Sequence, residues 1–282
     1  MIDLQRLSSD QPIGVFDSGL GGLTVVRQIL RLMPGEDVVY LGDSARVPYG
    51  IKSPETIRAF AHEDAAFLLR QNPKLIVVAC NTASAVAMDS LRQAMPVEVV
   101  GVVEPAAQRA VELAAGRGIG VIGTEATITS GAYQRALHAL NGGSEIMAAA
   151  APLLVPIVEE GRPQEDPITT YVLTDYLHEL QRKRPAVLIL GCTHYPLLSL
   201  AIGKLMGPDT ALLDPGEAVA RRVQEFLRSH DLLAGRAAGQ LQCYSTDNPE
   251  RFSKLATRFL GRDVGQVKRI GTEELAKLSK PV

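Results

Sequence analysis

The sequence predicts an α/β fold of two pseudo-symmetric, doubly wound domains with mainly parallel sheets and a functional site in the cleft between the domains. Short apolar runs alternate with helical segments along the chain, as they do in proteins with parallel sheets. Two of these runs, at 75–79 and 187–190, are wholly apolar, as strands buried on both faces are. Each run leads into a small polar loop that contains a cysteine, Cys80 or Cys192. Ligands bind beyond the carboxyl ends of such strands, so we expect the chemistry at these cysteines.

Four strands and their connecting helices are predicted before residue 104. The predicted strands are 12–16, 38–41, 75–79 and 97–103, and the predicted helices are 23–32, 54–71 and 83–93. Pro34 and Gly35 end the first helix, and Pro105 falls in the first turn of a further helix.

A second set of strands repeats this order. The sequence IGVI at 119–122 repeats IGVF at 13–16, and strands are expected at 153–158, ending at Glu159, and at 187–190. Three strands in the same order at nearly constant spacing suggest a duplicated α/β unit, or two independent halves that look alike.

The C-terminal segment is expected to complete the first domain. It contains predicted helices at 217–229 and 249–260 and predicted strands at 240–245 and 267–270, too few elements for a separate domain. We therefore predict a first domain of residues 1–103 plus 215–282 and a second domain of residues 104–214.

Composition and charge exclude several classes of function. The net charge is −2, the isoelectric point is near 6.2, and lysine and arginine are scattered, so no basic face for a nucleic acid is expected. The N-terminal residues lack the features of a secretory signal, and no apolar run is long enough to span a membrane. The three cysteines are widely separated, which argues against disulfides and for a reducing cytoplasm. We therefore predict a cytoplasmic protein with a small-molecule substrate and no nucleic-acid or membrane partner.

The loop DSGLGG at 17–22 joins a predicted strand to a helix and can offer backbone N–H groups to an anion. It lacks the last glycine of a dinucleotide-binding GxGxxG motif, where Thr24 stands, and it lacks the Lys-Ser/Thr ending of a phosphate loop. The alternative interpretation is a tight turn in which Asp17 caps the helix.

Cys80 and Cys192 are the strongest candidates for chemistry. A cysteine between a strand end and a helix N-terminus is expected to have a pKa below its free value of about 8.5. The adjacent Asn81, Thr82 and Thr193 are typical helix caps that can also bind a substrate carboxylate. A single buried cysteine is more often a packing residue, but two cysteines in matching positions of a repeat favour function.

Other polar residues also have both a functional and a structural interpretation. His194 is predicted to be a partner acid or base for Cys192 rather than a structural histidine. Asp43 and Glu159 are each expected to end a strand at the same cleft, as helix caps or as partners of a substrate ammonium group. Cys243 lies in the predicted strand at 240–245 and is predicted to be a core residue. No metal site is predicted, because there is no CxxC motif and Cys192 and His194 alone supply only two ligands.

Two thiols on opposite walls of a cleft suit a reaction that removes a proton from one face of a carbon and returns one to the other face. One thiolate acts as base and the other thiol as acid, and the roles exchange in the reverse direction. The α-proton of an amino acid is a very weak acid, so the polar loops must supply donors that stabilise the carbanion. The pattern therefore predicts two-base proton transfer at the α-carbon of an amino acid.

Seven motifs lie in order along nearly the whole chain: GVFDSGLGGLTVV (14–26), YLGDSARVPYG (40–50), VVACNTASA (77–85), VIGTEATITSGAY (121–133), LLVPIVEEG (153–161), LGCTHYPLL (190–198) and DPGEAVA (214–220). In these motifs the chain resembles the cofactor-independent glutamate racemases of the aspartate/glutamate racemase superfamily. The resemblance implies interconversion of L- and D-glutamate without pyridoxal phosphate or metal, which supplies D-glutamate for bacterial peptidoglycan.

The resemblance also implies roles for single residues. Cys80 would deprotonate the D-enantiomer and Cys192 the L-enantiomer, with Asp17 assisting the first thiol and His194 the second. The implied substrate contacts are Asp17, Ser18, Tyr49, Gly50, Asn81, Thr82, Thr193 and His194. Secondary positions are Asp43, Pro48, Thr124, Thr127 and Glu159.

Two other interpretations stay open. An aspartate racemase, or another cysteine-pair amino-acid racemase, would differ from this one in the pocket rather than in the chemistry. A non-catalytic amino-acid binding protein could share the architecture, since fold does not fix function, but it has no need of two thiols. The resemblance is also compatible with a homodimer.

Overall fold

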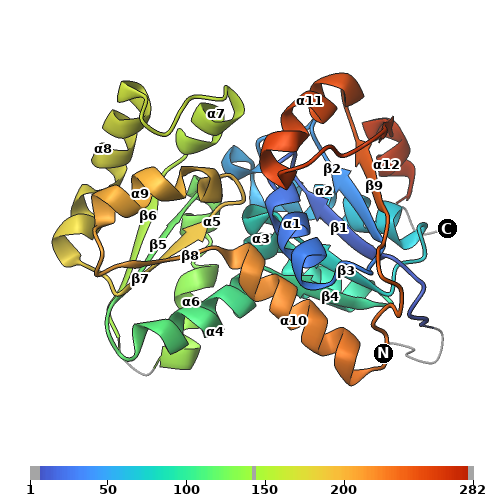
Figure 1. The fold of residues 1–282 in the computed structure, drawn as a ribbon, viewed down its shortest axis with the longest axis horizontal. Helices are drawn as coiled ribbons and strands as arrows, with labels where there is room; N and C mark the ends of the chain where they lie inside the picture. The colour runs from blue at the N-terminus through green and yellow to red at the C-terminus, as the bar shows by residue number, and fades with distance from the viewer. Residues whose placement is uncertain (1–6, 142–143, 279–282) are drawn as a thin grey trace.

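Two parallel β-sheets with helices around them make up the part of the chain that the computed structural model describes, residues 7–141 and 144–278 (Figure 1). The first sheet has six strands in the order β10-β9-β2-β1-β3-β4, namely β1 (Ile13–Asp17), β2 (Val38–Gly42), β3 (Leu75–Val78), β4 (Glu98–Gly101), β9 (Leu241–Ser245) and β10 (Val267–Arg269). The second has four in the order β6-β5-β7-β8, namely β5 (Ile119–Gly123), β6 (Ile146–Ala150), β7 (Val187–Gly191) and β8 (Ala211–Leu213). Neighbouring strands are parallel in both sheets, which confirms the predicted α/β class.

The two sheets share one arrangement of strands. The order β2-β1-β3-β4 in the first sheet matches the order β6-β5-β7-β8 in the second. Strands β3 and β7, which lead to Cys80 and Cys192, therefore hold equivalent places.

The predicted strand at 153–158 is wrong, because this segment forms helix α7 (Leu154–Glu159). Its apolar run contains Pro156, which has no N–H group to donate to a sheet ladder and so disfavours a central strand. The true counterpart of β2 is β6, an edge strand whose sequence IMAAA has low strand propensity. Glu159 therefore ends a helix and not a strand.

Helices cover both faces of the first sheet. On one face lie α1 (Leu23–Leu32), α10 (Pro215–Ser229) and α11 (Pro249–Leu260), and on the other lie α2 (Pro54–Leu69), α3 (Asn81–Ala94) and α12 (Thr272–Leu278). Ile13 and Val15 of β1 pack with the first group, and Phe16 packs with the second. Side chains alternate between the faces of a strand, so burial of both faces requires the continuous apolar runs seen in the sequence.

The second sheet packs with helices of more varied length. These are α4 (Val103–Ala114), α5 (Glu125–Thr129), α6 (Ala132–Asn141), α7, α8 (Pro167–Lys183) and α9 (Ser199–Met206), with two short 3₁₀ helices, η2 (Tyr49–Ile51) and η3 (Tyr195–Leu198), in loops after β2 and β7. Buried residues of β5 and β7 belong to the same apolar cluster as Ile13 and Val15, so one core is continuous between the sheets.

Four helices begin with a capping residue followed by proline. Ser53, Asp166, Asp214 and Asn248 each accept a hydrogen bond from a backbone N–H of the first turn, and proline follows each of them. Proline needs no hydrogen-bond acceptor at the first helical position, and its fixed φ suits the helix. The starts of these four helices are therefore determined by residues that are adjacent in the sequence.

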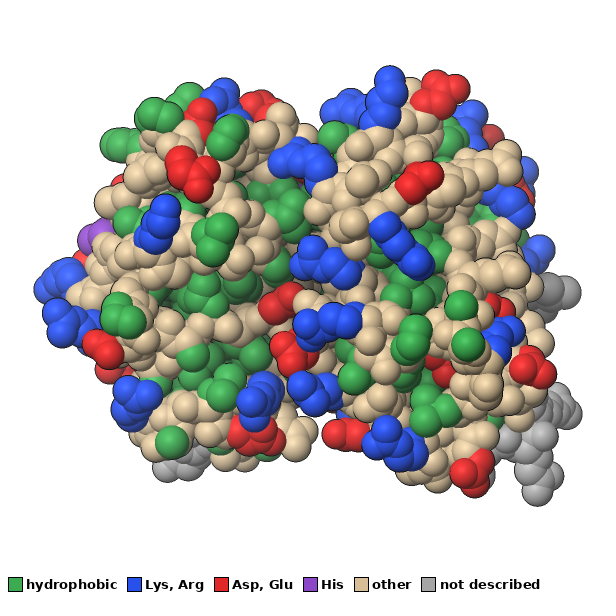
Figure 2. Space-filling model, viewed as in Figure 1, with side chains coloured by type: hydrophobic (Ala, Val, Ile, Leu, Met, Phe, Trp, Pro, Cys, Tyr) green, Lys and Arg blue, Asp and Glu red, His purple; other side chains and the backbone are tan. Residues whose placement is uncertain are grey.

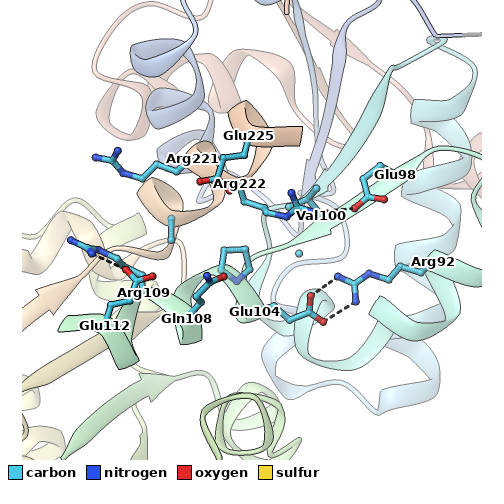
Figure 3. Close-up of a pocket in the computed structure, with 13 residues that line it drawn as sticks. Arg92, Glu98, Val100, Glu104, Gln108, Arg109, Glu112, Arg221, Arg222 and Glu225 are labelled. Atoms are coloured by element: carbon cyan, nitrogen blue, oxygen red, sulfur yellow. Dashed lines mark hydrogen bonds and ion pairs between the residues drawn. The ribbon is translucent and has the colours of Figure 1, made fainter. Parts of the chain in front are cut away.

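Helices α4 and α10 carry the chain between the sheets and pack against each other. A pocket of about 240 Å³ opens beside them, and charged side chains of both signs line it (Figure 3). Within it, Arg92 of α3 donates two hydrogen bonds of 2.7 Å to Glu104 of α4. The division into domains at residues 1–103 plus 215–282 and 104–214 stays a prediction.

On the face shown in Figure 2, lysine and arginine side chains are interspersed with aspartate and glutamate. Within residues 7–141 and 144–278, no helix has the length and apolar character needed to cross a membrane.

Candidate active site

The predicted site residues come from loops at the carboxyl ends of strands in both sheets. Asp17 ends β1, Asp43 follows β2, Cys80 follows β3, Thr124 follows β5 and Cys192 follows β7. Such loops are where parallel sheets bind ligands, and here the loops of the two sheets contact each other.

The first thiol lies at the start of α3. Cys80 is 4% exposed and is the N-cap residue, with its Sγ atom 3.5 Å from the backbone nitrogen of Ala83 and 3.6 Å from Oγ of Ser18. Burial, together with the nearby charge of Asp17, raises the pKa of Cys80 to about 12. The expected lowering of this pKa is therefore wrong for the structure as it stands. The helix N-terminus favours a thiolate, but removal from water outweighs it.

The second thiol lies beside a histidine. Cys192 is 6% exposed, and its Sγ atom is 3.8 Å from Nδ1 of His194. The opposite ring nitrogen, Nε2, is 3.1 Å from Oε1 of Glu159. Burial lowers the pKa of His194, but hydrogen bonds to Cys192 and Glu159 outweigh it and raise the pKa to about 10. The ring edge also packs against Phe259. The geometry suits an imidazolium that donates to the sulfur on one side and to a carboxylate on the other.

The loop of Cys192 contacts the glycine-rich loop that follows β1 in the first sheet. Oγ1 of Thr193 is 3.4 Å from Oδ1 of Asp17, and the backbone oxygen of Thr193 accepts a 3.1 Å hydrogen bond from Thr24. Asp17 is fully buried, accepts from the backbone of Gly19 and has a pKa that burial raises. A Cβ atom on Gly21 would lie 2.1 Å from Oγ1 of Thr193, so only glycine allows this approach. Asp17 does not cap helix α1, whose N-cap is Gly22.

Three threonine hydroxyls form a second link between the sheets. Oγ1 of Thr82 is 2.9 Å from that of Thr124 and 3.2 Å from that of Thr127, and the last two are 2.8 Å apart. Gly50 lies against this cluster, since a Cβ atom there would be 2.6 Å from Cβ of Thr124. Three of the four predicted threonines are thus brought together, with the loop of Gly50 beside them.

Asn81 is oriented by a residue that the sequence analysis did not single out. Its Oδ1 atom accepts a 2.7 Å hydrogen bond from the hydroxyl of Tyr133, which leaves the NH₂ group as the donor of this side chain. Tyr133 lies at the end of the motif VIGTEATITSGAY, which was the available signal for it. Asn81 and Thr82 are the first residues of α3, and Cys80 rather than either of them is its cap.

Tyr49 and Asp43 belong to a different cluster. The Tyr49 hydroxyl contacts the carboxylates of Asp43 and Asp64, and Asp43 also binds Arg46 at 2.6 Å. These contacts join Tyr49 to charged side chains of the loop after β2 and of helix α2, and not to either thiol. The peptide bond before Pro48 is cis. Arg46, Asp64 and Thr246, which bind Asp43 or Tyr49, were not predicted.

Cys243 is fully buried in the core, as expected. Across residues 7–141 and 144–278, no group of three or more His, Cys, Asp or Glu side chains is placed to hold a metal ion.

An α/β protein in which equivalent strands of two sheets each present a buried thiol, one beside a histidine, carries the groups that acid–base chemistry requires. The chain is a member of the Asp/Glu/Hydantoin racemase family, which it matches over residues 13–223. It is 44% identical over 262 residues to the glutamate racemase of Geobacter metallireducens, which covers 93% of this chain and 97% of that protein.

Two solved structures are similar along nearly their whole length. A glutamate racemase isoform of Bacillus anthracis superposes with a TM-score of 0.90 at 36% identity, covering 94% of this chain and 98% of that one. The glutamate racemase of Francisella tularensis, solved in complex with D-glutamate, superposes with a TM-score of 0.87 at 36% identity, covering 93% of this chain and 98% of that one.

Proposed function

We propose that this protein is a glutamate racemase that interconverts L- and D-glutamate by a two-base mechanism without a cofactor. The observation that carries the proposal is the position of the thiols, since Cys80 follows β3 and Cys192 follows β7, and these strands hold the same place in the two sheets. Similarity to the glutamate racemases of Geobacter metallireducens and Bacillus anthracis supports the activity, and the Francisella tularensis complex with D-glutamate supports the substrate.

The electrostatics of the site give each thiol a starting role. Burial and Asp17 keep Cys80 protonated, so it is the acid when L-glutamate binds. Cys192, as a thiolate beside the His194 ring, takes the α-proton of L-glutamate and becomes a thiol, and the electron pair of the C–H bond stays on the α-carbon. The Cys80 S–H then delivers its proton to the opposite face. For D-glutamate, Cys80 is the base and Cys192 the acid.

Polar groups around the thiols bind the substrate in this proposal. Backbone and side-chain donors of Ser18, Tyr49, Gly50, Asn81, Thr82 and Thr193, with Asp17 and His194, hold its charged groups and stabilise the carbanion. Thr124 and Thr127 hold Thr82, Glu159 holds His194, and Asp43 with Pro48 holds the loop of Tyr49.

The cellular role in this proposal follows from the resemblance to the glutamate racemases. The enzyme acts in the cytoplasm and supplies D-glutamate for peptidoglycan. Its domains are residues 1–103 plus 215–282 and residues 104–214, with the site in the cleft between them. A homodimer is part of the prediction, and light scattering at several protein concentrations tests it.

Incubation of the purified protein with L-glutamate in D₂O, with no cofactor added, tests the proposal. Proton NMR follows exchange of the α-hydrogen, and circular dichroism follows the loss of optical activity. Exchange together with racemisation is the expected result, and the same experiment with aspartate identifies an aspartate racemase. Glutamate binding without exchange or racemisation would instead indicate a binding protein and would overturn the proposal.

A further inference from the structure

A buried group of charged side chains surrounds the Tyr49 hydroxyl. The hydroxyl contacts Oδ2 of Asp43 and lies 3.0 Å from Oδ2 of Asp64. Arg46 reaches three carboxyl groups, with Nε 2.6 Å from Asp43, Nη2 3.2 Å from Asp64, and Nη1 in contact with Glu63. The Asp43 and Asp64 side chains are fully buried, and those of Arg46 and Glu63 are 12% and 14% exposed.

The charges of this group do not balance if every carboxyl group is ionised. Asp43, Glu63 and Asp64 would carry three negative charges, and Arg46 is the one cation that the described structure places in contact with them. An unpaired charge removed from water is costly, and a carboxyl group escapes that cost by keeping its proton. At least one of the three is therefore expected to be neutral.

Hydrogen-bond geometry selects Asp64 as the neutral one. Burial, together with the nearby carboxylates of Asp64 and Asp43, raises the pKa of Tyr49, so its hydroxyl holds one proton. Asp43 is the closer acceptor and takes that proton in a hydrogen bond. Oδ2 of Asp64 can then bond to the Tyr49 oxygen only if Asp64 is itself the donor.

The other contacts fit this assignment. Asp43 accepts from Tyr49, from Nε of Arg46 and, at 2.9 Å, from the hydroxyl of Thr246, as an ionised carboxylate does. Arg46 donates to Oδ1 of Asp64, the oxygen that carries no proton. Burial and the charge of Asp43 also raise the pKa of Asp64.

We propose that Asp64 is a positioning residue that stays protonated and donates a hydrogen bond to Tyr49, which in turn fixes the substrate-binding loop at Tyr49 and Gly50. The part of this inference that concerns substrate rests on the proposed function. Gly50 packs against Thr124 of the second sheet's loop, so the position of Tyr49 sets how closely the two loops approach.

Infrared difference spectroscopy tests the protonation of Asp64 without any reference to activity. At neutral pH, the spectrum of the unchanged protein minus that of Asp64→Asn is expected to contain the C=O band of a protonated carboxylic acid. Glu63→Gln, which changes a carboxylate that binds the same arginine, is the matched control and should leave this band in place. Absence of the band from the Asp64→Asn difference spectrum would overturn the proposal.

Steady-state kinetics test the positioning role. The amide of Asp64→Asn can still donate to Tyr49 and accept from Arg46, so its KM for glutamate is expected to stay within about threefold of the original value. Asp64→Leu lacks both bonds, and its KM should rise by about tenfold while kcat changes less. Equal KM values for the two variants, or an unchanged KM in Asp64→Leu, would contradict positioning by this hydrogen bond. If Asp64→Leu does not fold, Asp64→Ala replaces it. A protein that shows the band but does not turn over glutamate would refute the proposed function and leave the protonation of Asp64 established.

Discussion

Oγ1 of Thr193 lies 3.4 Å from Oδ1 of Asp17, although 176 residues separate them in the chain. Thr193 follows β7 of the second sheet, and Asp17 ends β1 of the first. Burial raises the pKa of Cys80, and the charge of Asp17 adds to this effect. Thr193 lies between Cys192 and His194 in the chain. The surroundings of each thiol are therefore linked to a residue from the other sheet, and a change in one loop should affect both steps of a two-thiol reaction.

Replacement of either thiol should nearly abolish racemisation. General acid–base catalysis contributes about 10²–10⁴-fold, so we expect Cys80→Ser and Cys192→Ser each to lower kcat/KM by about that factor. L- and D-glutamate have equal free energies in water, so kcat/KM must fall by the same factor in both directions. Circular dichroism from each enantiomer measures this. Cys243→Ala, at a thiol buried in the core away from the site, is the control and should keep ordinary activity. Ordinary activity in either serine variant would refute the two-base mechanism.

A methyl group at Gly21 should separate the loop after β1 from the loop of Cys192. The Cβ atom of Gly21→Ala would lie 2.1 Å from Oγ1 of Thr193 and 2.7 Å from Nδ1 of His194, so these groups must move. A displacement of about 1 Å can lower a rate by about 10²-fold, and we expect a loss of that order in kcat/KM. In the matched variant Gly203→Ala, the nearest atom outside the backbone of its own helix is Cδ1 of Leu212, 3.7 Å away, so activity should not change. Equal activity of the two variants would contradict a close contact at Gly21.

Loss of the carboxylate at Glu159 should lower the pKa of His194. Burial alone lowers this pKa, and the hydrogen bonds to Cys192 and Glu159 together raise it to about 10. In Glu159→Gln we expect NMR titration of the ring to move to lower pH by about one unit or more and kcat/KM to fall by about tenfold. Glu160→Gln, one residue later and exposed, contacts Arg162 instead and should change neither quantity. A ring titration unchanged by Glu159→Gln would show that Glu159 does not hold His194.

The buried ion pair between Lys74 and Glu36 should be important for stability. Nζ of Lys74 lies 2.5 Å from Glu36 and donates to the backbone oxygens of Ser9 and Leu232, at 2.8 Å each. Lys74→Met leaves a buried carboxylate without its cation, which costs about 3–5 kcal/mol in the free energy of unfolding. Denaturant titration measures it. Lys183→Met removes a lysine from an exposed pair and should cost less than about 1 kcal/mol. Similar losses in the two variants would contradict this account.

The protonation of Asp64 predicts a pH dependence of stability. Folded Asp64 keeps a proton that the unfolded chain releases above a pKa of about 3.9, so the stability this group contributes is lost as pH rises toward its raised folded pKa. Relative to Asp64→Asn, the unchanged protein should lose up to about 1.4 kcal/mol per pH unit in that interval. Urea titrations of both proteins at several pH values measure the difference. A difference that does not vary with pH would mean that Asp64 is ionised in the folded state.

Local patterns predicted most of the first sheet correctly. The strands predicted at 12–16, 38–41 and 75–79 correspond within one residue at each end to β1, β2 and β3, and helix α11 has the predicted bounds Pro249–Leu260. These elements follow from short-range causes, namely strands that need apolar residues on both faces and helices that begin at a cap followed by proline. The apolar run at 153–158 predicts a strand but forms helix α7, because a short apolar run suits a buried helix equally well.

The candidate site also contains both residues that the sequence identifies and residues that only the packing of distant segments brings in. Sequence motifs identify Cys80, Cys192 and His194, because each follows or lies close to a buried strand in a polar loop. They give no sign of Asp64, which lies within helix α2 and gains its partners Tyr49 and Arg46 only when α2 packs beside the loop after β2. Such contacts form between segments that the fold brings together, so the spacing of residues in the sequence does not predict them.

The sequence by itself determined the α/β class, the two thiols and the polar loops around them, since each of these depends on residues close together in the chain. Only the tertiary structure decided the protonation of these groups. Burial and the charge of Asp17 raise the pKa of Cys80 to about 12. Burial lowers the pKa of His194, but hydrogen bonds to Cys192 and to Glu159 outweigh it and raise the pKa to about 10. Burial belongs to the whole fold, and at Cys80 it outweighs the local effect of the helix N-terminus on which the sequence prediction was based.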